Sequence, residues 1–188
     1  WPDGFDVRTL GGTQLIKQAD VVMTMFLLNE EFDDETIRRN YEYYLPRTMH
    51  KSTLSAGIYS IVALRLGEES EAYTSFIRTA EADLLDTQGS TWQGPHIASA
   101  GATWQAAHFG FAGLKIGNDG VLTIEPRLPA RWSELSTGIV WRGVPLRITV
   151  RGGDVAIERL SNATPGHEES AKSDRVVVRV NGEEREVV

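Results

Sequence analysis

Three polar segments of this sequence carry side chains that hold anions, and each stands near the start of a predicted helix. Lys17 and Gln18 interrupt an apolar segment, the sequence HKSTLS occupies residues 50–55, and His96 opens a run of small residues. Ammonium, amide, hydroxyl and imidazole groups all donate hydrogen bonds to oxygen. Such groups gathered at helix N-terminal ends predict a site for an oxyanion.

Five helices are predicted from the apolar spacing and from the residues at their ends. Pro95 suits a first helical turn, because the N–H that it lacks has no partner there. Acidic residues and glycines mark other starts and stops. The predicted ranges are residues 12–29, 33–45, 52–67, 69–86 and 95–115.

The order of these helices predicts that their polar starts lie together. Short connections make neighbouring helices antiparallel, so the first, third and fifth helices run in the same direction. Their N-terminal ends, each worth about half a positive charge, then share one side of the helical layer. The long connection of residues 87–94 leads to the same side, and long connections are often functional. The shared end, more than any single residue, indicates a site.

Each residue of this predicted site also has a purely structural interpretation. Lys17 can be a solvent-exposed charge whose stem covers apolar surface. Ser52, Thr53 and Ser55 can be N-caps of a helix. His96 alone can be an ordinary core or surface histidine. These interpretations stay open at the level of single residues.

The sequence changes character from residue 118 onward. Short runs alternate apolar and polar residues and end at glycine, proline or an Asn-Asp-Gly turn, which predicts a small antiparallel β unit. The predicted domains are therefore residues 1–117, helical, and residues 118–188, sheet. Trp132 and Trp141 could form a sugar-binding platform, but the pattern favours packing against the helices. His108 is predicted to pack in the core.

The composition excludes several classes of function. A net charge of −7 argues against nucleic acid as a partner. The absence of cysteine excludes disulfides, thiol nucleophiles and cysteine-bound zinc. The longest apolar run, residues 21–28, is too short to span a membrane. We expect a cytoplasmic protein that needs no metal and no cofactor.

Four segments, in this order, resemble the C-terminal part of family 65 glycoside hydrolases: LIKQADVV, HKSTLS, GPHIASAGATWQAAHFGFAGL and LTIEPRLPARWSEL. The family includes maltose, trehalose, kojibiose and nigerose phosphorylases and related hydrolases. The resemblance implies the C-terminal part of an (α/α)6 barrel followed by a small, sandwich-like antiparallel β domain. Five helices cannot close such a barrel, so we expect the chain to be part of a longer enzyme, which the resemblance implies is a homodimer.

The resemblance also implies roles for individual residues. Lys17 and Gln18 match the pair that binds the donor glucose, and Ser52, Thr53 and His96 match phosphate ligands. The implied reaction is inverting phosphorolysis of an α-linked glucose disaccharide, with inorganic phosphate as co-substrate and β-glucose 1-phosphate as product. The general acid of the family is a glutamate in an upstream segment that nothing here matches. No catalytic residue is therefore expected in this chain, which should be inactive alone.

Two alternatives to phosphorolysis remain at this point. The first is an α-glucoside hydrolase of the same family, and the second is a non-catalytic carbohydrate-binding fragment. Lys51 stands where the family usually has an acidic residue, and its positive charge, with His96, favours phosphorolysis. The stretch STWQGPHIASAGA resembles the kojibiose phosphorylases of the family.

Overall fold

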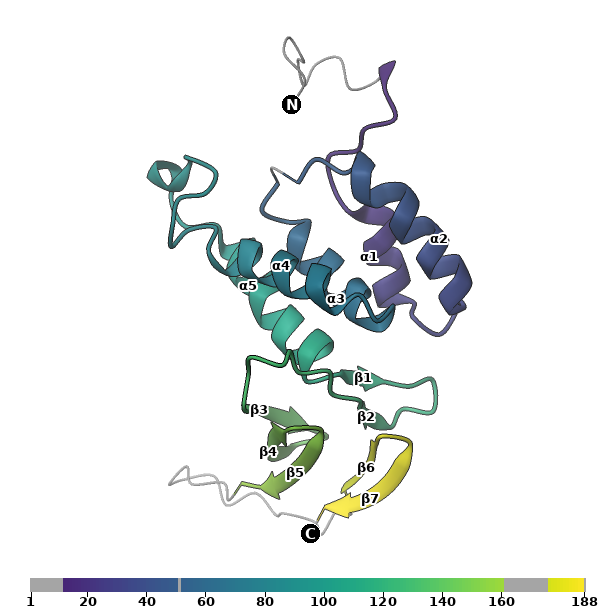
Figure 1. Ribbon diagram of the computed structural model, residues 1–188. Helices are drawn as coiled ribbons and strands as arrows, with labels where there is room; N and C mark the ends of the chain where they lie inside the picture. Colours follow the sequence, from purple (N-terminus) through teal and green to yellow (C-terminus); the bar gives the residue numbers. More distant parts are fainter. Residues whose placement is uncertain (1–11, 51, 161–175, 188) are drawn as a thin grey trace. The chain divides into compact units, whose positions relative to one another are not determined.

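The computed structural model describes residues 12–50, 52–160 and 176–187. The chain divides into two compact units, Trp1–Ala107 and His108–Val188. The first unit is helical and the second consists mainly of strands (Figure 1). This order confirms the predicted succession of helices and strands.

Within the described residues, the helical unit contains five α-helices. A short 3-10 helix follows α2, and another precedes α5. The helices are α1 (Asp20–Leu27), α2 (Asp34–Tyr44), α3 (Ala56–Arg65), α4 (Glu69–Ala80) and α5 (Ile97–Gln105), and the 3-10 helices are η2 (Leu45–Arg47) and η3 (Thr91–Gln93).

Helix α3 forms the centre of the helical unit. All its residues from Ala56 to Leu64 are buried, and it contacts α1, α2, α4 and α5. A helix that is apolar on every side must be covered on every side. Gly57 allows α5 to approach closely, because a Cβ atom built there would lie 2.6 Å from the Cβ of Ala102.

Helices α1 and α3 begin later than the sequence predicted, at Asp20 rather than residue 12 and at Ala56 rather than residue 52. Before α3, residues 52–55 form a turn in which the Leu54 N–H donates to the Ser52 side-chain oxygen. For α1 the reason is a parallel β-bridge between Ile16 and Thr48. The Ile16 N–H donates to the Arg47 carbonyl at 2.9 Å, and the Met49 N–H donates to the Ile16 carbonyl at 2.8 Å. Backbone groups engaged in this bridge are extended and cannot join a helix.

Helix α2 begins as predicted. Asp33 is its N-cap, and its carboxylate accepts the Thr36 N–H at 2.7 Å. This bond satisfies a backbone donor that the helix leaves unpaired. Helix α4 was predicted to reach residue 86 but ends at Ala80. The following turns place Asp86 at φ +45°, a left-handed conformation that no α-helix contains.

The fifth helix is shorter than predicted. Helix α5 ends at Gln105, a π-helical segment η4 continues over Ala106–Phe111, and a strand follows at Leu114–Ile116. Gly113 makes the turn into this strand at φ +65°, where an added Cβ would collide with the Glu125 carbonyl. The helical unit thus ends at Ala107, whereas the predicted boundary lies after residue 117.

The described strands of the second unit form two sheets. One has the order β1-β2-β6-β7 and the other the order β3-β4-β5. Neighbouring strands are antiparallel as predicted, except that β2 and β6 pair in parallel. The strands are β1 (Leu114–Ile116), β2 (Leu122–Ile124), β3 (Leu135–Trp141), β4 (Val144–Arg151), β5 (Asp154–Arg159), β6 (Val176–Val180) and β7 (Glu183–Val187).

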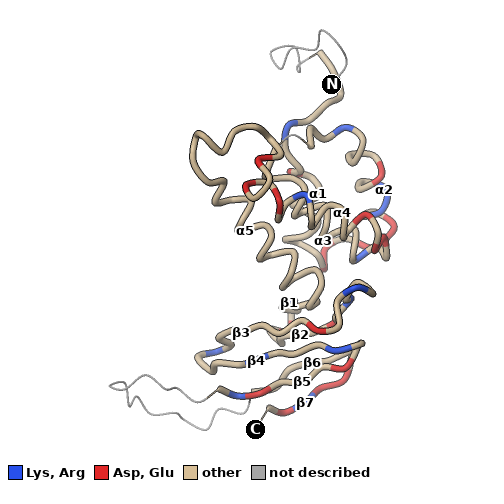
Figure 2. Tube along the Cα trace, turned by 60° about the vertical axis from the view of Figure 1, so that its left-hand side comes forward, with Lys and Arg blue, Asp and Glu red and all other residues tan. Residues whose placement is uncertain are grey.

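The two sheets share one apolar core. Leu146 and Ile148 of β4 and Val178 of β6 are fully buried members of it. Alternate residues of β4 face inward, as expected for strands with one buried face. The outward positions of β4 include Arg147 and Arg151, and β7 carries three glutamates, seen in red in Figure 2. This unit therefore has a complete core of its own.

Candidate functional site

The structure brings two of the predicted site residues into contact. The Ser52 hydroxyl donates to the Gln18 side-chain oxygen at 3.1 Å. Both side chains are half-buried, and neither lies in a helix. The bridge between Ile16 and Thr48 holds the two segments side by side. One predicted donor-glucose residue and one predicted phosphate residue are therefore in contact here.

The other members of these two segments lie close by in the chain. Lys17 is exposed to solvent and precedes α1, so its predicted position within a helix is wrong. Thr53 is half-buried in the turn before α3, next to Ser52, whose side-chain oxygen accepts the Leu54 N–H at 3.3 Å. Lys51 lies outside the described residues. The turn therefore keeps the predicted hydroxyls outside the helix, at its mouth.

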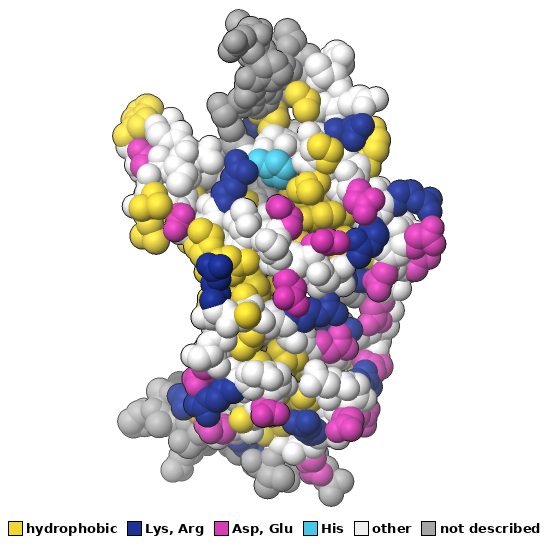
Figure 3. Space-filling view, viewed as in Figure 1, with side chains coloured by type: hydrophobic (Ala, Val, Ile, Leu, Met, Phe, Trp, Pro, Cys, Tyr) yellow, Lys and Arg dark blue, Asp and Glu magenta, His cyan; other side chains and the backbone are white. Residues whose placement is uncertain are grey.

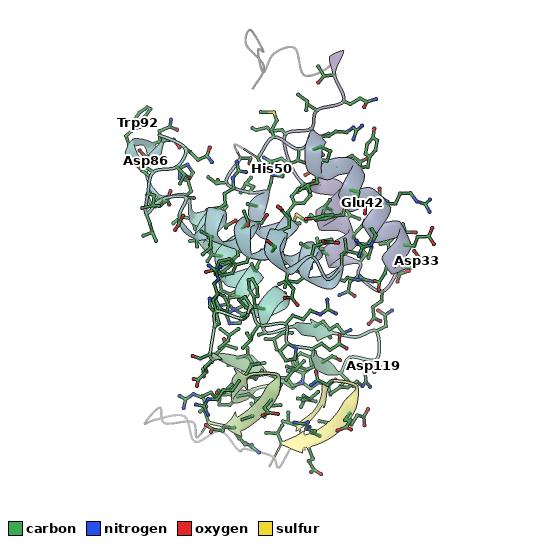
Figure 4. All side chains as sticks on the ribbon, in the orientation of Figure 1. Asp33, Glu42, His50, Asp86, Trp92 and Asp119 are labelled. Atoms are coloured by element: carbon green, nitrogen blue, oxygen red, sulfur yellow. The ribbon has the colours of Figure 1, made fainter. Side chains whose placement is uncertain are left out.

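His50 anchors the turn that carries these hydroxyls. Its Nε2 atom lies 2.8 Å from the Leu45 carbonyl oxygen, and its ring packs against the edge of Tyr59 at 5.1 Å between centroids. The Arg78 guanidinium donates to the His50 carbonyl. Figure 4 labels His50 beside the start of α3. These contacts give His50 a structural task and fix the turn from both sides.

His96 is the N-cap residue of α5, and an aspartate holds it at two points. The ring Nδ1 lies 2.5 Å from one carboxylate oxygen of Asp83, and the His96 backbone N–H donates to the other at 2.6 Å. The hydrogen bonds from the ring and the backbone hold the pKa of Asp83 below its usual value. An ionised carboxylate only accepts hydrogen bonds, so the proton of this contact lies on Nδ1.

The loop between α4 and α5 presents a hydroxyl to the same ring. Ser90 Oγ lies 3.3 Å from His96 Nε2. Asp86 fixes this loop, because its carboxylate accepts the N–H groups of Ser90 at 2.8 Å and Thr91 at 3.0 Å. Both bonds lower the pKa of Asp86. The predicted functional loop thus contributes Ser90 to the surroundings of His96.

The last turn of α4 links these groups into one region. Arg78 contacts the carbonyl of His50 before α3, and the Thr79 carbonyl accepts the Ser99 hydroxyl of α5 at 3.0 Å. The segment before α3 and the start of α5 therefore both contact the last turn of α4. Within the described part of the chain, no hydrogen bond joins His96 to Ser52 directly.

Three residues of this region were not predicted from the sequence: Asp83, Ser90 and Arg78. Asp83 precedes His96 by 13 residues, and nothing in the local pattern relates the two. The Asp86 turn was the detectable signal, because an aspartate that starts a turn accepts N–H groups further along the chain. Recognising that turn would have placed Ser90 in an ordered loop.

Large apolar side chains on this loop are exposed. Leu84 is 80% exposed and Trp92 is 81% exposed. In Figure 3 such side chains gather on the segment between α4 and α5, and Figure 4 labels Trp92 and Asp86 there. Leu27 of α1 and Trp104 of α5 are exposed as well. The helical unit thus presents more apolar surface than a closed core requires.

The aromatic residues once considered as a sugar platform in the sheet unit are engaged in packing. Trp132 packs against Phe111 with the rings tilted by 54° and 4.7 Å between their centroids. Trp141 packs against the apolar core of the sheet unit, as does Phe109 of the π-helical segment η4. His108 is buried, as predicted, and bonds to the Thr137 hydroxyl. Trp132 and Trp141 are thus both engaged in packing within the sheet unit, which favours the structural interpretation of these residues.

Among the described residues, none of the helices is long and apolar enough to cross a membrane. This agrees with the short apolar run noted in the sequence.

Comparison with protein families gives two matches in chain order. A model of the glycosyl hydrolase family 65 central catalytic domain matches residues 5–105. A model of the glycosyl hydrolase family 65 C-terminal domain matches residues 114–167. The change from the first model to the second falls where α5 gives way to β1.

Individual relatives agree with these matches. A kojibiose phosphorylase of Caldanaerobacter subterraneus is 51% identical over 85% of this chain and 21% of its own length. A trehalose phosphorylase of Geobacillus stearothermophilus is 42% identical over 76% of this chain and 18% of its own. A solved structure described as a kojibiose phosphorylase from the human microbiome superposes with a TM-score of 0.84 at 32% identity, covering 98% of this chain and 23% of that one. The chain thus spans about a fifth of the length of the curated relatives it matches.

Proposed function

This chain belongs to glycosyl hydrolase family 65, and we propose that it supplies the donor-glucose and phosphate subsites of an inverting disaccharide phosphorylase. The observation that carries the proposal is the hydrogen bond between Gln18 and Ser52. It joins a residue proposed to bind glucose to a residue proposed to bind phosphate. A phosphorylase needs these two ligands in contact, because phosphate attacks the glucosyl carbon directly.

The proposed reaction transfers a glucosyl group to phosphate. A carboxylic acid protonates the leaving glycosidic oxygen, and a phosphate oxygen attacks the anomeric carbon from the opposite face. The carbon–oxygen bond to the acceptor sugar breaks, and β-glucose 1-phosphate and the free sugar leave. Phosphate is already a nucleophile, so it needs positioning more than a strong base. We assign no acid to this chain and propose that a glutamate outside these 188 residues supplies it.

We propose that three residues hold the phosphate: Ser52, Thr53 and His96. The hydroxyls lie just before the N-terminal end of α3, and the imidazole lies at the N-terminal end of α5. Helix N-terminal ends favour bound anions, and hydroxyl and imidazole donors add direct hydrogen bonds. Lys17 and Gln18 would hold the donor glucose.

Kojibiose is the substrate to test first. Two relatives with 51% and 48% identity, from Caldanaerobacter subterraneus and Thermoanaerobacter brockii, are kojibiose phosphorylases. We further propose that phosphate is the only co-substrate, that no cofactor or metal takes part, and that the whole enzyme works as a homodimer in the cytoplasm. The exposed apolar side chains of α1 and α5 fit a unit that is covered by the rest of an enzyme.

The experiment is a phosphorolysis assay on the complete gene product. Kojibiose, trehalose, maltose and nigerose are each offered with and without phosphate, and β-glucose 1-phosphate and glucose are measured. We expect β-glucose 1-phosphate from one disaccharide, only when phosphate is present. Glucose release at the same rate without phosphate would instead identify a hydrolase and refute the proposal.

Two variants connect the assay to the site. His96→Ala should raise the KM for phosphate about tenfold or more, because it removes a charge-assisted hydrogen bond. Thr74→Ala is the control, since Thr74 is exposed on α4 and its hydroxyl donates to the Ser70 carbonyl of the same helix; it should leave the KM for phosphate unchanged. The 188-residue chain alone should show no turnover of any of the four sugars.

A further inference from the structure

We propose that Asp83 is the positioning residue for His96, and that it acts on phosphate binding only through the histidine. This inference rests on the proposed function, since it takes His96 as a phosphate ligand. The carboxylate touches His96 at two points and would not itself touch the ligand. It sets which ring nitrogen faces the ligand and stabilises the charged ring.

The two contacts fix both the backbone and the ring of His96. One oxygen of Asp83 accepts the backbone N–H at 2.6 Å, and the other accepts from Nδ1 at 2.5 Å. The backbone N–H is free for this contact because His96 is the N-cap residue of α5. A ring held at its nitrogen and at its backbone keeps one orientation. The carboxylate therefore fixes the position and orientation of the His96 side chain.

The two contacts with Asp83 leave one ring nitrogen of His96 for a ligand. With Nδ1 committed to Asp83, only Nε2 remains, and Ser90 Oγ is its neighbour at 3.3 Å. A phosphate oxygen accepts from Nε2 only when that atom carries a proton, which requires the doubly protonated ring. An adjacent carboxylate stabilises that cation through a charge-assisted hydrogen bond. Histidines that bind metal ions commonly donate their other ring N–H to a carboxylate in the same way.

Replacing the carboxylate has two opposed effects. Its negative charge repels phosphate, so Asp83→Asn would lower the KM for phosphate if charge alone mattered. Loss of the two contacts that fix His96, and of the carboxylate that stabilises the imidazolium, raises the KM for phosphate. We expect the second effect to win, because the contact with the ring is direct and short whereas phosphate would lie beyond the ring. The sign of the change therefore separates positioning from simple repulsion.

The test is a double-mutant cycle in the complete gene product with phosphate and the disaccharide varied separately. We expect Asp83→Asn to raise the KM for phosphate about tenfold, with the KM for the disaccharide changed less than twofold. The double variant Asp83→Asn, His96→Ala should match His96→Ala alone, because a residue that acts through another has nothing left to act on. Asp83→Glu, which keeps a carboxylate, should recover part of the loss.

The matched control is Glu81→Gln, which removes the same charge two residues away, at the end of α4. It should leave both KM values unchanged within twofold. If Asp83→Asn does not fold, Asp83→Glu and its double variant with His96→Ala carry the same cycle with a smaller effect. Thermal unfolding of every variant separates loss of fold from loss of binding.

The outcomes separate this inference from the function on which it rests. If His96→Ala raises the phosphate KM and Asp83→Asn leaves it unchanged or lowers it, the positioning role is overturned and the phosphate site stands. Effects of the two variants that simply add would also overturn it. If His96→Ala leaves the phosphate KM unchanged, the proposed phosphate site itself fails.

Discussion

The two histidines His96 and His108 lie 12 residues apart in the sequence. Their burial and hydrogen-bond partners nevertheless differ. In the helical unit, His96 is half-buried and bonds to a carboxylate and a serine. In the sheet unit, His108 is buried and bonds to the Thr137 hydroxyl. The first ring is partly exposed and lies beside a carboxylate, whereas the second ring is enclosed in the protein. The two histidines therefore differ in their partners, and only His96 is proposed to bind a ligand.

The units differ in their cores in a similar way. The sheet unit encloses valine, leucine and isoleucine between two sheets and has its own centre. The helical unit is centred on α3 but leaves Met23, Leu27 and Trp104 largely exposed. A unit with a complete core can tolerate an altered surface, whereas a unit with uncovered apolar faces depends on what covers them. Three substitutions test the packing of the sheet core, the contact between α3 and α5, and the cap of α2.

The largest effect is expected in the sheet core. Leu146 of β4 is fully buried, so Leu146→Ala leaves a cavity and should lower the free energy of unfolding by about 2–5 kcal/mol. Val140→Ala on the exposed side of β3 is the control and should change it little. Chemical denaturation measures both. Equal losses for the two variants would contradict the enclosed core.

A smaller effect is expected where α3 meets α5. Gly57→Ala places a Cβ atom 2.6 Å from that of Ala102, and overpacking of this kind costs about 1–3 kcal/mol, offset in part by better helix propensity. Gly101→Ala is the control, because nothing lies within 4 Å of its added Cβ. It should stabilise α5 slightly. A stabilising Gly57→Ala would show that the two helices are not in close contact.

The smallest effect is expected at the N-cap of α2. The Asp33 carboxylate accepts hydrogen bonds from Thr36, and these bonds lower the pKa of Asp33 below 3.8 in the folded protein. The stability that Asp33 contributes is therefore complete above the unfolded pKa and is lost as the pH falls through the folded one. Asp33→Ala should be less stable than the parent at neutral pH, and the difference should shrink in acid. A difference that stays constant with pH would exclude a charged cap.

The sequence by itself determined the local elements and the family. Apolar spacing located the helices, Asp33 marked the start of α2, and alternation located the strands and their inward faces. The four ordered segments indicated the family that both domain matches then supported. These features depend on residues that are close together in the chain, so local pattern is sufficient to reveal them.

Only the tertiary structure decided how the site is assembled. The bridge between Ile16 and Thr48 delays the start of α1 and holds two segments side by side, and the side chains of Gln18 and Ser52 are hydrogen-bonded there. The pairing of Asp83 with His96 and the parallel pairing of β2 with β6 were equally invisible in the local pattern. All these contacts join segments that chain folding brings together from a distance. Whether such contacts form depends on the tertiary course of the backbone. The spacing of residues within one segment does not predict that course.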